Sequence, residues 1–390
     1  MNKLSAVPSS QLSHTQVHAW LEELFSDHLH AKRVLSLANA TTGVLHAASL
    51  GINAIGRGLA SARGLLDKHA IKQVDRMFSN PKILGTEAQR AWVRFVLAQR
   101  RKVFLNLDWS DFDRDDQTTL LLAVQTGHGR ATPLLWKTVR KSQLKDQRND
   151  HEDALLNTLK SLLPEGVDVT IVADRGFGDW KLYDFLSELG FEYIIRFRGN
   201  IHVTDAKGET KAAKDWVGKH GRMRVLRDAL VTASENYPVS TVVCVQDKGM
   251  KDAWCIVASD PTVRGVALKG HYGKRFTIEE SLRDIKDDRF GLGLKQVRTK
   301  SCERRDRLIW VCVLAHTLLT LLGAAGEAEG LDRMLKSNTS KKRQLSLFRQ
   351  GLRWYDLLPN MPEPRLRKLM TRFDQMLRDH AIFSEIFGVL

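Results

Sequence analysis

The stretch VFLNLDWSDFDRDDQTTLLLAVQT, residues 103–126, contains two apolar, strand-like runs, 103–108 and 119–126, separated by a charged turn. Residues 131–139 form a third such run, so the three together predict a meander. Downstream, the pattern predicts a helix, a buried strand, a second helix and a further strand, at 150–163, 169–173, 179–189 and 193–197. We therefore expect an α/β fold with a mixed sheet covered by helices.

The segment before the sheet is expected to be helical, with helices at 14–28, 31–48, 52–66, 69–78 and 86–99. Within it, residues 45–77 form two short helices joined at 49–51 and then a helix rich in Lys and Arg. This pattern suits a helix-turn-helix DNA reader, although any small helical bundle shows the same breaks. The opening MNKLSAVPSSQLSHTQ has no apolar stretch behind its lysine, so we expect no secretory signal.

After the sheet, residues 199–265 run as further strand-like pieces separated by charged turns, and the last 60 residues look helical and basic. The apolar run 308–325 is interrupted by His316, Thr317 and Thr320. It is expected to be a buried core helix and not a membrane span.

Charge and cysteine usage narrow the class of protein. The chain has 60 Lys plus Arg against 45 Asp plus Glu, a net charge of +15, which favours nucleic acid as partner over an anionic membrane. The chain has four cysteines, Cys244, Cys255, Cys302 and Cys312, with neither CxxC spacing nor His partners nearby. We therefore expect reduced thiols in a cytoplasmic protein, with no zinc site and no disulfide framework.

Two acids stand at expected strand ends: Asp108 after the first strand and Asp174 after the fourth. Strand ends hold side chains rigidly at one edge of a sheet, so these carboxylates, with a third from a following helix, can share divalent metal. Carboxylate oxygens suit Mg²⁺ better than His or Cys does. Taken singly, an Asp after a strand is more often a turn residue or a helix cap than a metal ligand.

Residues 272–286, YGKRFTIEESLRDIK, supply that third acid. Read as one helix at roughly 100° per residue, one arc of about 100° holds a phenol, an aromatic ring, a carboxylate and three cations: Tyr272, Arg275, Phe276, Glu279, Arg283 and Lys286. Ile278, Leu282 and Ile285 form a separate apolar stripe. The arc is typical of a metal site on a phosphodiester backbone, or of a solvated face with Glu-to-Arg pairs four residues apart.

Taken together, these motifs resemble one family. LDWSD around Asp108, ADRGF around Asp174, and Y-x2-R-x3-E-x6-K at Tyr272, Arg275, Glu279 and Lys286, followed by GLGL, are similar to the DDE transposases of bacterial insertion sequences. The likeness is to the cut-and-paste branch that excises DNA through a hairpin, and it covers about residues 100–325. It implies a ribonuclease-H-like mixed sheet flanked by helices, with an inserted β-rich subdomain and an all-helical N-terminal domain.

The resemblance also implies roles for the site residues. Asp108, Asp174 and Glu279 would be the catalytic triad, holding two Mg²⁺ ions for which Mn²⁺ can substitute. Tyr272, Arg275 and Lys286 would bind phosphates near the cleaved end, with Arg283 on the same face. Phe276 would wedge into the base stack and Trp254 would receive a flipped base, although both also have ordinary explanations as packed aromatic residues.

The implied reaction has four steps: water cuts one strand at each transposon end, the freed 3′-hydroxyl closes a hairpin, a second water reopens it, and the 3′-hydroxyls join target DNA. We expect a homodimer on double-stranded DNA, both transposon ends and target, near the bacterial nucleoid and with no membrane role. The expected division is a helical DNA-binding domain, a catalytic core in two parts around an inserted β subdomain, and a C-terminal helical region, at 1–97, 98–198 with 266–330, 199–265 and 331–390. Two alternatives remain: a ribonuclease-H-like nuclease without strand transfer, and a catalytically idle DNA-binding regulator derived from a transposase.

Overall fold

The structure, a computed structural model, describes residues 12–232 and 234–379. The expectation about a secretory signal concerns residues that lie mostly outside this range. The expected N-terminal helices are confirmed, each within a few residues at its ends: α1 (His14–Phe25), α2 (Ala31–Ala47), α3 (Ile52–Arg63), α4 (Asp67–Ser79) and α5 (Thr86–Leu97). The breaks also fall where expected, because Ala48 adopts a left-handed conformation and Asn80 precedes the proline of a 3-10 turn.

A mixed sheet of ten strands forms the centre of the molecule, in the order β3-β2-β1-β4-β5-β10-β9-β8-β6-β7. The first five strands are β1 (Lys102–Phe112), β2 (Gln117–Val124), β3 (Thr132–Arg140), β4 (Asp168–Ala173) and β5 (Glu192–Phe197). β1 to β3 are the antiparallel meander predicted from the sequence, while β4 pairs parallel to β1 and β5 parallel to β4. Helices α6 (Arg148–Leu162) and α7 (Trp180–Glu188) make the crossovers that parallel strands require.

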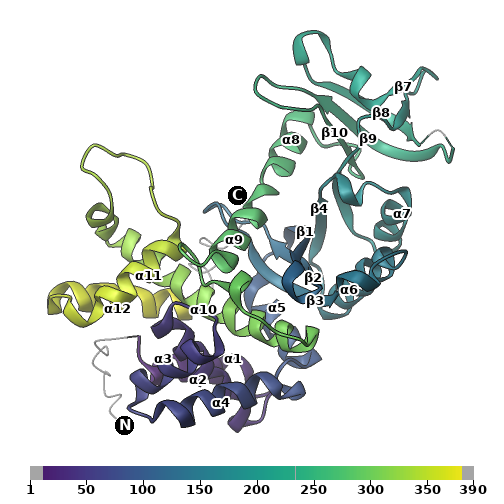
Figure 1. Ribbon diagram of the computed structural model, residues 1–390. Coiled ribbons are helices and arrows are strands. Elements are labelled where there is room, and N and C mark those ends of the chain that lie inside the picture. The colour runs from purple at the N-terminus through teal and green to yellow at the C-terminus, as the bar shows by residue number, and fades with distance from the viewer. Residues whose placement is uncertain (1–11, 233, 380–390) are drawn as a thin grey trace.

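The strand-like pieces predicted at 199–265 are also strands, and they continue the same sheet. They are β6 (His202–Thr204), β7 (Thr210–Ala212), β8 (Arg224–Val231), β9 (Tyr237–Val245) and β10 (Trp254–Ala258). β10 joins β5 in antiparallel register, with Cys255 opposite Phe197. In Figure 1 this part projects away from the N-terminal helices, at the upper right. The four cysteines are free thiols, as expected.

The prediction of a single helix over 272–286 is wrong at its N-terminal end. The structure has two helices, α8 (Gly265–Gly273) and α9 (Phe276–Lys286), separated at Lys274 and Arg275. At this junction the Arg275 N–H donates to the Tyr272 carbonyl (2.9 Å), a tighter three-residue turn. Gly270 and Gly273 weaken the helix just before it, because glycine loses the most backbone entropy on ordering. Tyr272 therefore belongs to a different helix from Glu279.

Helix α10 (Cys302–Ala328) is the expected core helix: its most apolar window is long enough to cross a membrane but is fully buried inside the protein. Helices α11 (Leu347–Leu357) and α12 (Glu363–Arg378) pack against it. The α10 and α11 backbones approach closely, because a Cβ on Gly323 would lie 1.8 Å from the Leu347 carbonyl oxygen. A Cβ on Gly351 would lie 1.8 Å from that of Leu319. Short 3-10 helices complete the described chain: η1 (Pro81–Ile83), η2 (Asp113–Asp115), η3 (Lys141–Gln143), η4 (Arg175–Phe177), η5 (Ala213–Trp216), η6 (Lys219–Gly221), η7 (Leu294–Gln296), η8 (Leu331–Leu335) and η9 (Leu358–Asn360).

Candidate active site

The first two predicted acids lie side by side on neighbouring strands. Leu107 of β1 pairs with Ala173 of β4, so Asp108 and Asp174 are the next residues of two parallel strands. The expectation that Asp108 ends its strand is wrong, because β1 continues to Phe112 in a hairpin with β2. What ends at Asp108 is the pairing with β4. Both carboxylates therefore emerge at the same edge of the parallel part of the sheet.

The third acid, Glu279, reaches this edge from α9 through an arginine. Arg275 Nη1 lies 3.6 Å from Asp108 Oδ2, and Arg275 Nη2 lies 2.5 Å from Glu279 Oε1. The Arg275 side chain is only 6% exposed, whereas that of Glu279 is 49% exposed. One buried guanidinium thus bridges the first and third acids.

The negative charge of the three acids affects the pKa of Asp108. Burial raises the Asp108 pKa to about 6, and the negative charges of Asp174 and Glu279 add to the rise. Arg275 and the Trp109 N–H, which donates to Asp108 Oδ1 (2.9 Å), act in the opposite direction. The positive charge of Arg275 therefore offsets only part of the rise in the Asp108 pKa.

The donor chemistry of these three side chains fits a divalent cation. All three offer carboxylate oxygens, the hard ligands that Mg²⁺ prefers, and their mutual repulsion is what a cation would relieve. Within residues 12–232 and 234–379, no three His, Cys, Asp or Glu side chains are already arranged to hold a metal ion. Arg275 contacts Asp108 and Glu279 in this structure, so metal binding requires these ion pairs to be exchanged.

The other basic residues of α9 lie along a groove beside the acids. Lys286 Nζ donates to Ser110 Oγ (3.0 Å) and to the Asp111 carbonyl (2.8 Å), and burial lowers its pKa, with nearby Lys295 adding to the effect. The Arg283 side chain is 64% exposed and pairs with Glu280 at 2.9 Å. The groove has a volume of about 670 Å³ and is lined by Asp108, Trp109, Ser110, Asp111, Arg114, Glu279, Leu282, Arg283, Lys286, Asp287, Asp288, Lys295 and Gln296.

Tyr272 does not face this groove, contrary to expectation. It is 1% exposed, and its ring packs edge-on against Trp254 with centroids 4.9 Å apart. Its burial raises the pKa of the phenol. Phe276 is 42% exposed and stacks near Trp254 at 6.1 Å, and the Arg275 guanidinium lies 4.9 Å from the Phe276 ring. The structure thus brings the predicted wedge and platform, Phe276 and Trp254, together.

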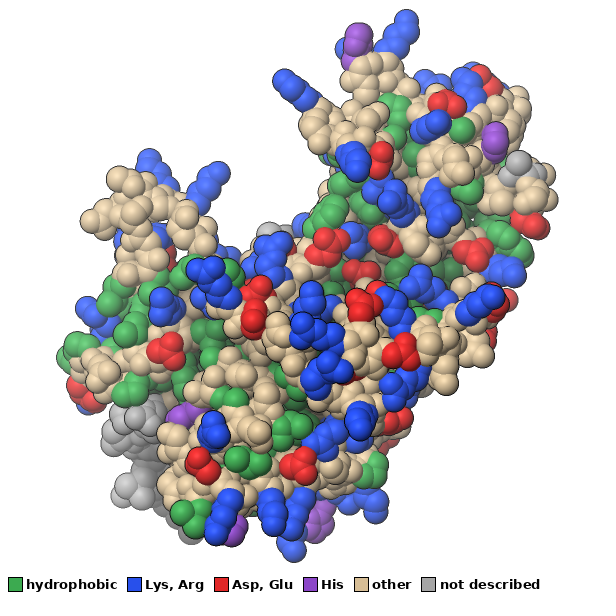
Figure 2. All heavy atoms as spheres, viewed as in Figure 1, with side chains coloured by type: hydrophobic (Ala, Val, Ile, Leu, Met, Phe, Trp, Pro, Cys, Tyr) green, Lys and Arg blue, Asp and Glu red, His purple; other side chains and the backbone are tan. Residues whose placement is uncertain are grey.

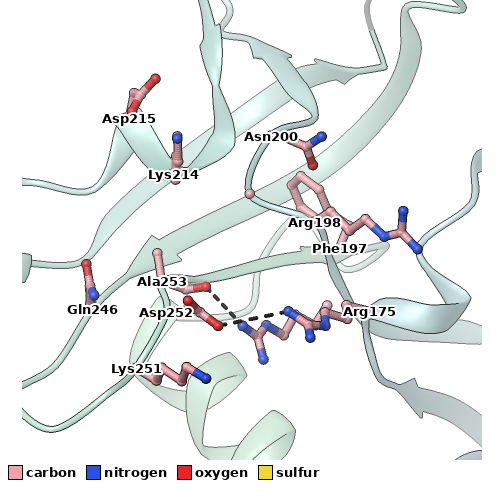
Figure 3. A pocket seen from close by; sticks show the side chains of 12 residues that line it. Arg175, Phe197, Arg198, Asn200, Lys214, Asp215, Gln246, Lys251, Asp252 and Ala253 are labelled. Atoms are coloured by element: carbon pink, nitrogen blue, oxygen red, sulfur yellow. Dashed lines mark hydrogen bonds and ion pairs between the residues drawn. The ribbon is translucent and has the colours of Figure 1, made fainter.

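A second cavity, of about 600 Å³, is lined by Arg175, the residue after Asp174, and was not predicted from the sequence (Figure 3). Its cations outnumber its acids: Arg175, Arg196, Arg198, Lys214 and Lys251 stand against Asp215 and Asp252. Arg196 donates to the Ala253 carbonyl (3.2 Å), and Arg175 lies 3.9 Å from Asp252. The RFR run at the end of β5 was the sequence signal that could have pointed to it.

The back of α9 is fixed by contacts that no sequence pattern indicated. Arg130 Nε lies 2.6 Å from Asp284 Oδ2, and these side chains are 18% and 5% exposed. The Ala131 N–H donates to Ser281 Oγ (2.7 Å), whose hydroxyl donates to the Ala131 carbonyl (2.8 Å). The turn before β3 therefore sets the position of the helix that carries Glu279 and Lys286.

Comparison with known protein families finds a match over part of this chain. Residues 135–318 match the sequence profile described as the Transposase DDE domain, a polynucleotidyl transferase family whose members generally use divalent metals. The match includes Asp174 and Glu279 and begins after Asp108. No curated protein matches the chain. The matched domain implies DNA transposition, and so DNA binding.

Proposed function

We propose that this protein is a transposase of the cut-and-paste, hairpin-forming branch, which excises an insertion sequence and integrates it into target DNA. The observation that carries the proposal is the arrangement of Asp108, Asp174 and Glu279 at one edge of a sheet within or beside the matched domain. Chemistry on DNA with one such site needs rigid carboxylates next to cations that can bind phosphate, and the strand-held acids beside Arg275, Arg283 and Lys286 support this reading.

Asp108, Asp174 and Glu279 would hold the metal, as two Mg²⁺ ions for which Mn²⁺ can substitute. When bound, the ions supply positive charge that activates the attacking oxygen and stabilises the leaving oxygen of an in-line phosphoryl transfer. The chain's own contribution is to fix the acids: Asp108 and Asp174 through strand pairing, and Glu279 through the anchored helix α9.

Arg275 is proposed to change partners when the site is loaded. Its guanidinium now neutralises Asp108 and Glu279, and a cation there would free it to bind a phosphate at the cleaved end. Lys286 and Arg283 would bind phosphates along the groove. Because Tyr272 is buried behind Arg275, we propose that it acts on DNA by positioning this guanidinium.

The aromatic pair supports the hairpin step. Phe276 is exposed enough to enter a base stack, and Trp254 lies beside it as a platform for an unstacked base. Stacking on an aromatic ring recovers roughly 1–3 kcal/mol per base, comparable to the few kcal/mol lost on flipping. Water would open the first strand, the freed 3′-hydroxyl would attack the opposite strand, and the hairpin would be reopened by water before joining to target.

We propose that DNA also contacts basic parts of the protein surface outside the groove. Figure 2 shows Lys and Arg side chains distributed over this face, in keeping with the net charge of +15. We propose that α1–α5 read the terminal inverted repeat, that the C-terminal helices help to bridge subunits, and that a homodimer holds both ends in the cytoplasm near the nucleoid.

The test is to incubate purified protein and Mg²⁺ with DNA carrying candidate transposon ends and to resolve the products on a denaturing gel. We expect nicked ends, hairpin-capped fragments and strand-transfer products. Asp108→Asn and Glu279→Gln should abolish all three, with thermal melting curves showing that both variants fold. Cleavage without hairpins or joined products would point instead to a nuclease, and metal-independent binding alone to a regulator.

A further inference from the structure

A second Arg-Phe pair follows the catalytic helix. Arg275-Phe276 stands at the beginning of α9, and Arg289-Phe290 comes three residues after its end, in the sequences KRF and DRF. The two pairs have the same geometry, since each guanidinium carbon lies 4.9 Å from the centroid of the adjacent ring. Both rings are also exposed, Phe276 at 42% and Phe290 at 50%. An exposed aromatic ring beside a guanidinium therefore stands at each end of one helix.

The second pair is held in place from two directions. Asp287 Oδ1 accepts from the backbone N–H groups of Arg289 (2.9 Å) and Phe290 (2.6 Å), which fixes the turn after α9. Arg349 of α11 donates to the Phe290 carbonyl (2.8 Å), and its guanidinium carbon lies 5.6 Å from the ring. Phe290 is therefore an ordered exposed ring, which loses little entropy when a ligand binds.

The pair lies beside the groove of the catalytic acids. Asp287 and Asp288, its immediate neighbours, line this groove together with Glu279 and Lys295. Helix α9 has 11 residues and so separates the two Arg-Phe pairs by roughly 16 Å at 1.5 Å per residue. One arginine-aromatic unit therefore lies at the end of α9 that carries Glu279, and the other lies beyond the end that carries Lys286.

The chemistry of the second unit suits a nucleic acid. In the part of the chain that the structure describes, neither Arg289 nor Arg349 has a carboxylate within ion-pair distance, so both cations are available to a phosphate. Bases stack on aromatic rings and on guanidinium planes, and this contact tolerates any sequence because every base has a π face.

We propose that Arg289, Phe290 and Arg349 form a second DNA-stacking contact, which holds target DNA beside the catalytic acids. This proposal rests on the proposed function. The transposon end is assigned to the Phe276 and Trp254 side, and joining the end to a target requires a second duplex at the same acids. The free side of the groove, with its own aromatic ring, is the place for it. Tolerance of any base suits a target better than a fixed terminal repeat.

The test compares two reactions of the same full-length protein with Mg²⁺: cleavage of uncut ends, and joining of pre-cut ends to a plasmid. Phe290→Ala and Arg289→Ala should lower the ratio of joining to cleavage roughly 5- to 150-fold, the factor that corresponds to one stacked base. Phe290→Trp should restore it. Leu357→Ala is the matched control, because this side chain is 41% exposed but lies on α11 outside the groove, and it should leave the ratio unchanged.

Each outcome decides the matter. Equal losses of cleavage and joining would show that Phe290 contacts the transposon end or its flank, and would overturn the target assignment. An unchanged ratio would overturn it as well. If the wild-type protein with Mg²⁺ neither cleaves ends nor joins pre-cut ones, the proposed function itself fails. Normal cleavage in all variants without the change in ratio would refute only the second contact.

Discussion

Removing the buried ion pair behind the catalytic helix should lower both stability and activity. Arg130 and Asp284 are 2.6 Å apart, and the Asp284 side chain is only 5% exposed. Burial raises the pKa of Asp284, and Arg130 opposes this rise. Arg130→Met leaves the acid buried without its cation, a change that costs roughly 3–5 kcal/mol in other proteins. Because Arg130 is 18% exposed, we expect the lower end, about 3 kcal/mol.

The measurement is urea denaturation at pH 7, followed by tryptophan fluorescence, on the wild type, Arg130→Met, Asp284→Asn and the double variant. Asp284→Asn removes the buried charge, so Arg130→Met should cost about 1–2 kcal/mol less in that background. The matched control is Arg367→Met, which breaks a pair exposed on both sides (62% and 64%) and should cost at most about 0.5 kcal/mol.

The same variants should affect chemistry through the position of Glu279. We expect Arg130→Met to lower the rate of end cleavage at temperatures where the protein remains folded, because the anchor of α9 is lost. A cost below about 0.5 kcal/mol for Arg130→Met, or the same cost with and without Asp284→Asn, would refute the reasoning.

Three further results are expected. Burial raises the pKa of Asp306 to about 7, so the folded protein is not destabilised by this group below the unfolded pKa near 4 and loses stability as the pH rises through 7. Asp306→Asn should therefore have a free energy of unfolding up to about 4 kcal/mol above that of the wild type at pH 8, but a similar one at pH 4. Equal shifts of the melting curve at both pH values would contradict this. Gly351→Ala should lower the free energy of unfolding, measured by urea denaturation, by about 1–3 kcal/mol, because the new Cβ would lie 1.8 Å from the Leu319 carbonyl oxygen. An unchanged urea midpoint would show that α10 and α11 can move apart without cost. Trp254→Ala should reduce hairpin products more than first-strand nicks on a denaturing gel, and a parallel loss of both would argue against a base platform.

The order of helices and strands could be predicted from the sequence because it depends on local patterns. The apolar runs of β1, β2 and β3 and the helices α1 to α5 follow periodicity and breaks at Gly51 and Pro81. The acids Asp108 and Asp174 could also be predicted as neighbours, because each comes directly after the apolar run of a strand, and these runs pair in parallel. These features need only residues close in the chain and the general rules of sheet topology.

Contacts between distant residues could not be predicted. The burial of Tyr272 follows from its packing against Trp254, and the bridge from Arg275 to Asp108 joins residues more than 160 positions apart. The cavity lined by Arg175 and Arg196 forms only because β10 pairs with β5 and brings Lys251 and Ala253 to the same cavity. Nothing in the local sequence fixes which strand edge the inserted strands join.

The amino-acid sequence alone therefore determined the fold class and the basic character, since these follow from composition and periodicity, and its motifs supplied the three acids that we propose as metal ligands. Only the tertiary structure decided that an arginine bridges two of those acids, that α8 and α9 are separate, and that a second exposed Arg-Phe unit follows α9. The physical reason is that electrostatics and side-chain burial depend on distances in space, which the packing of remote segments sets.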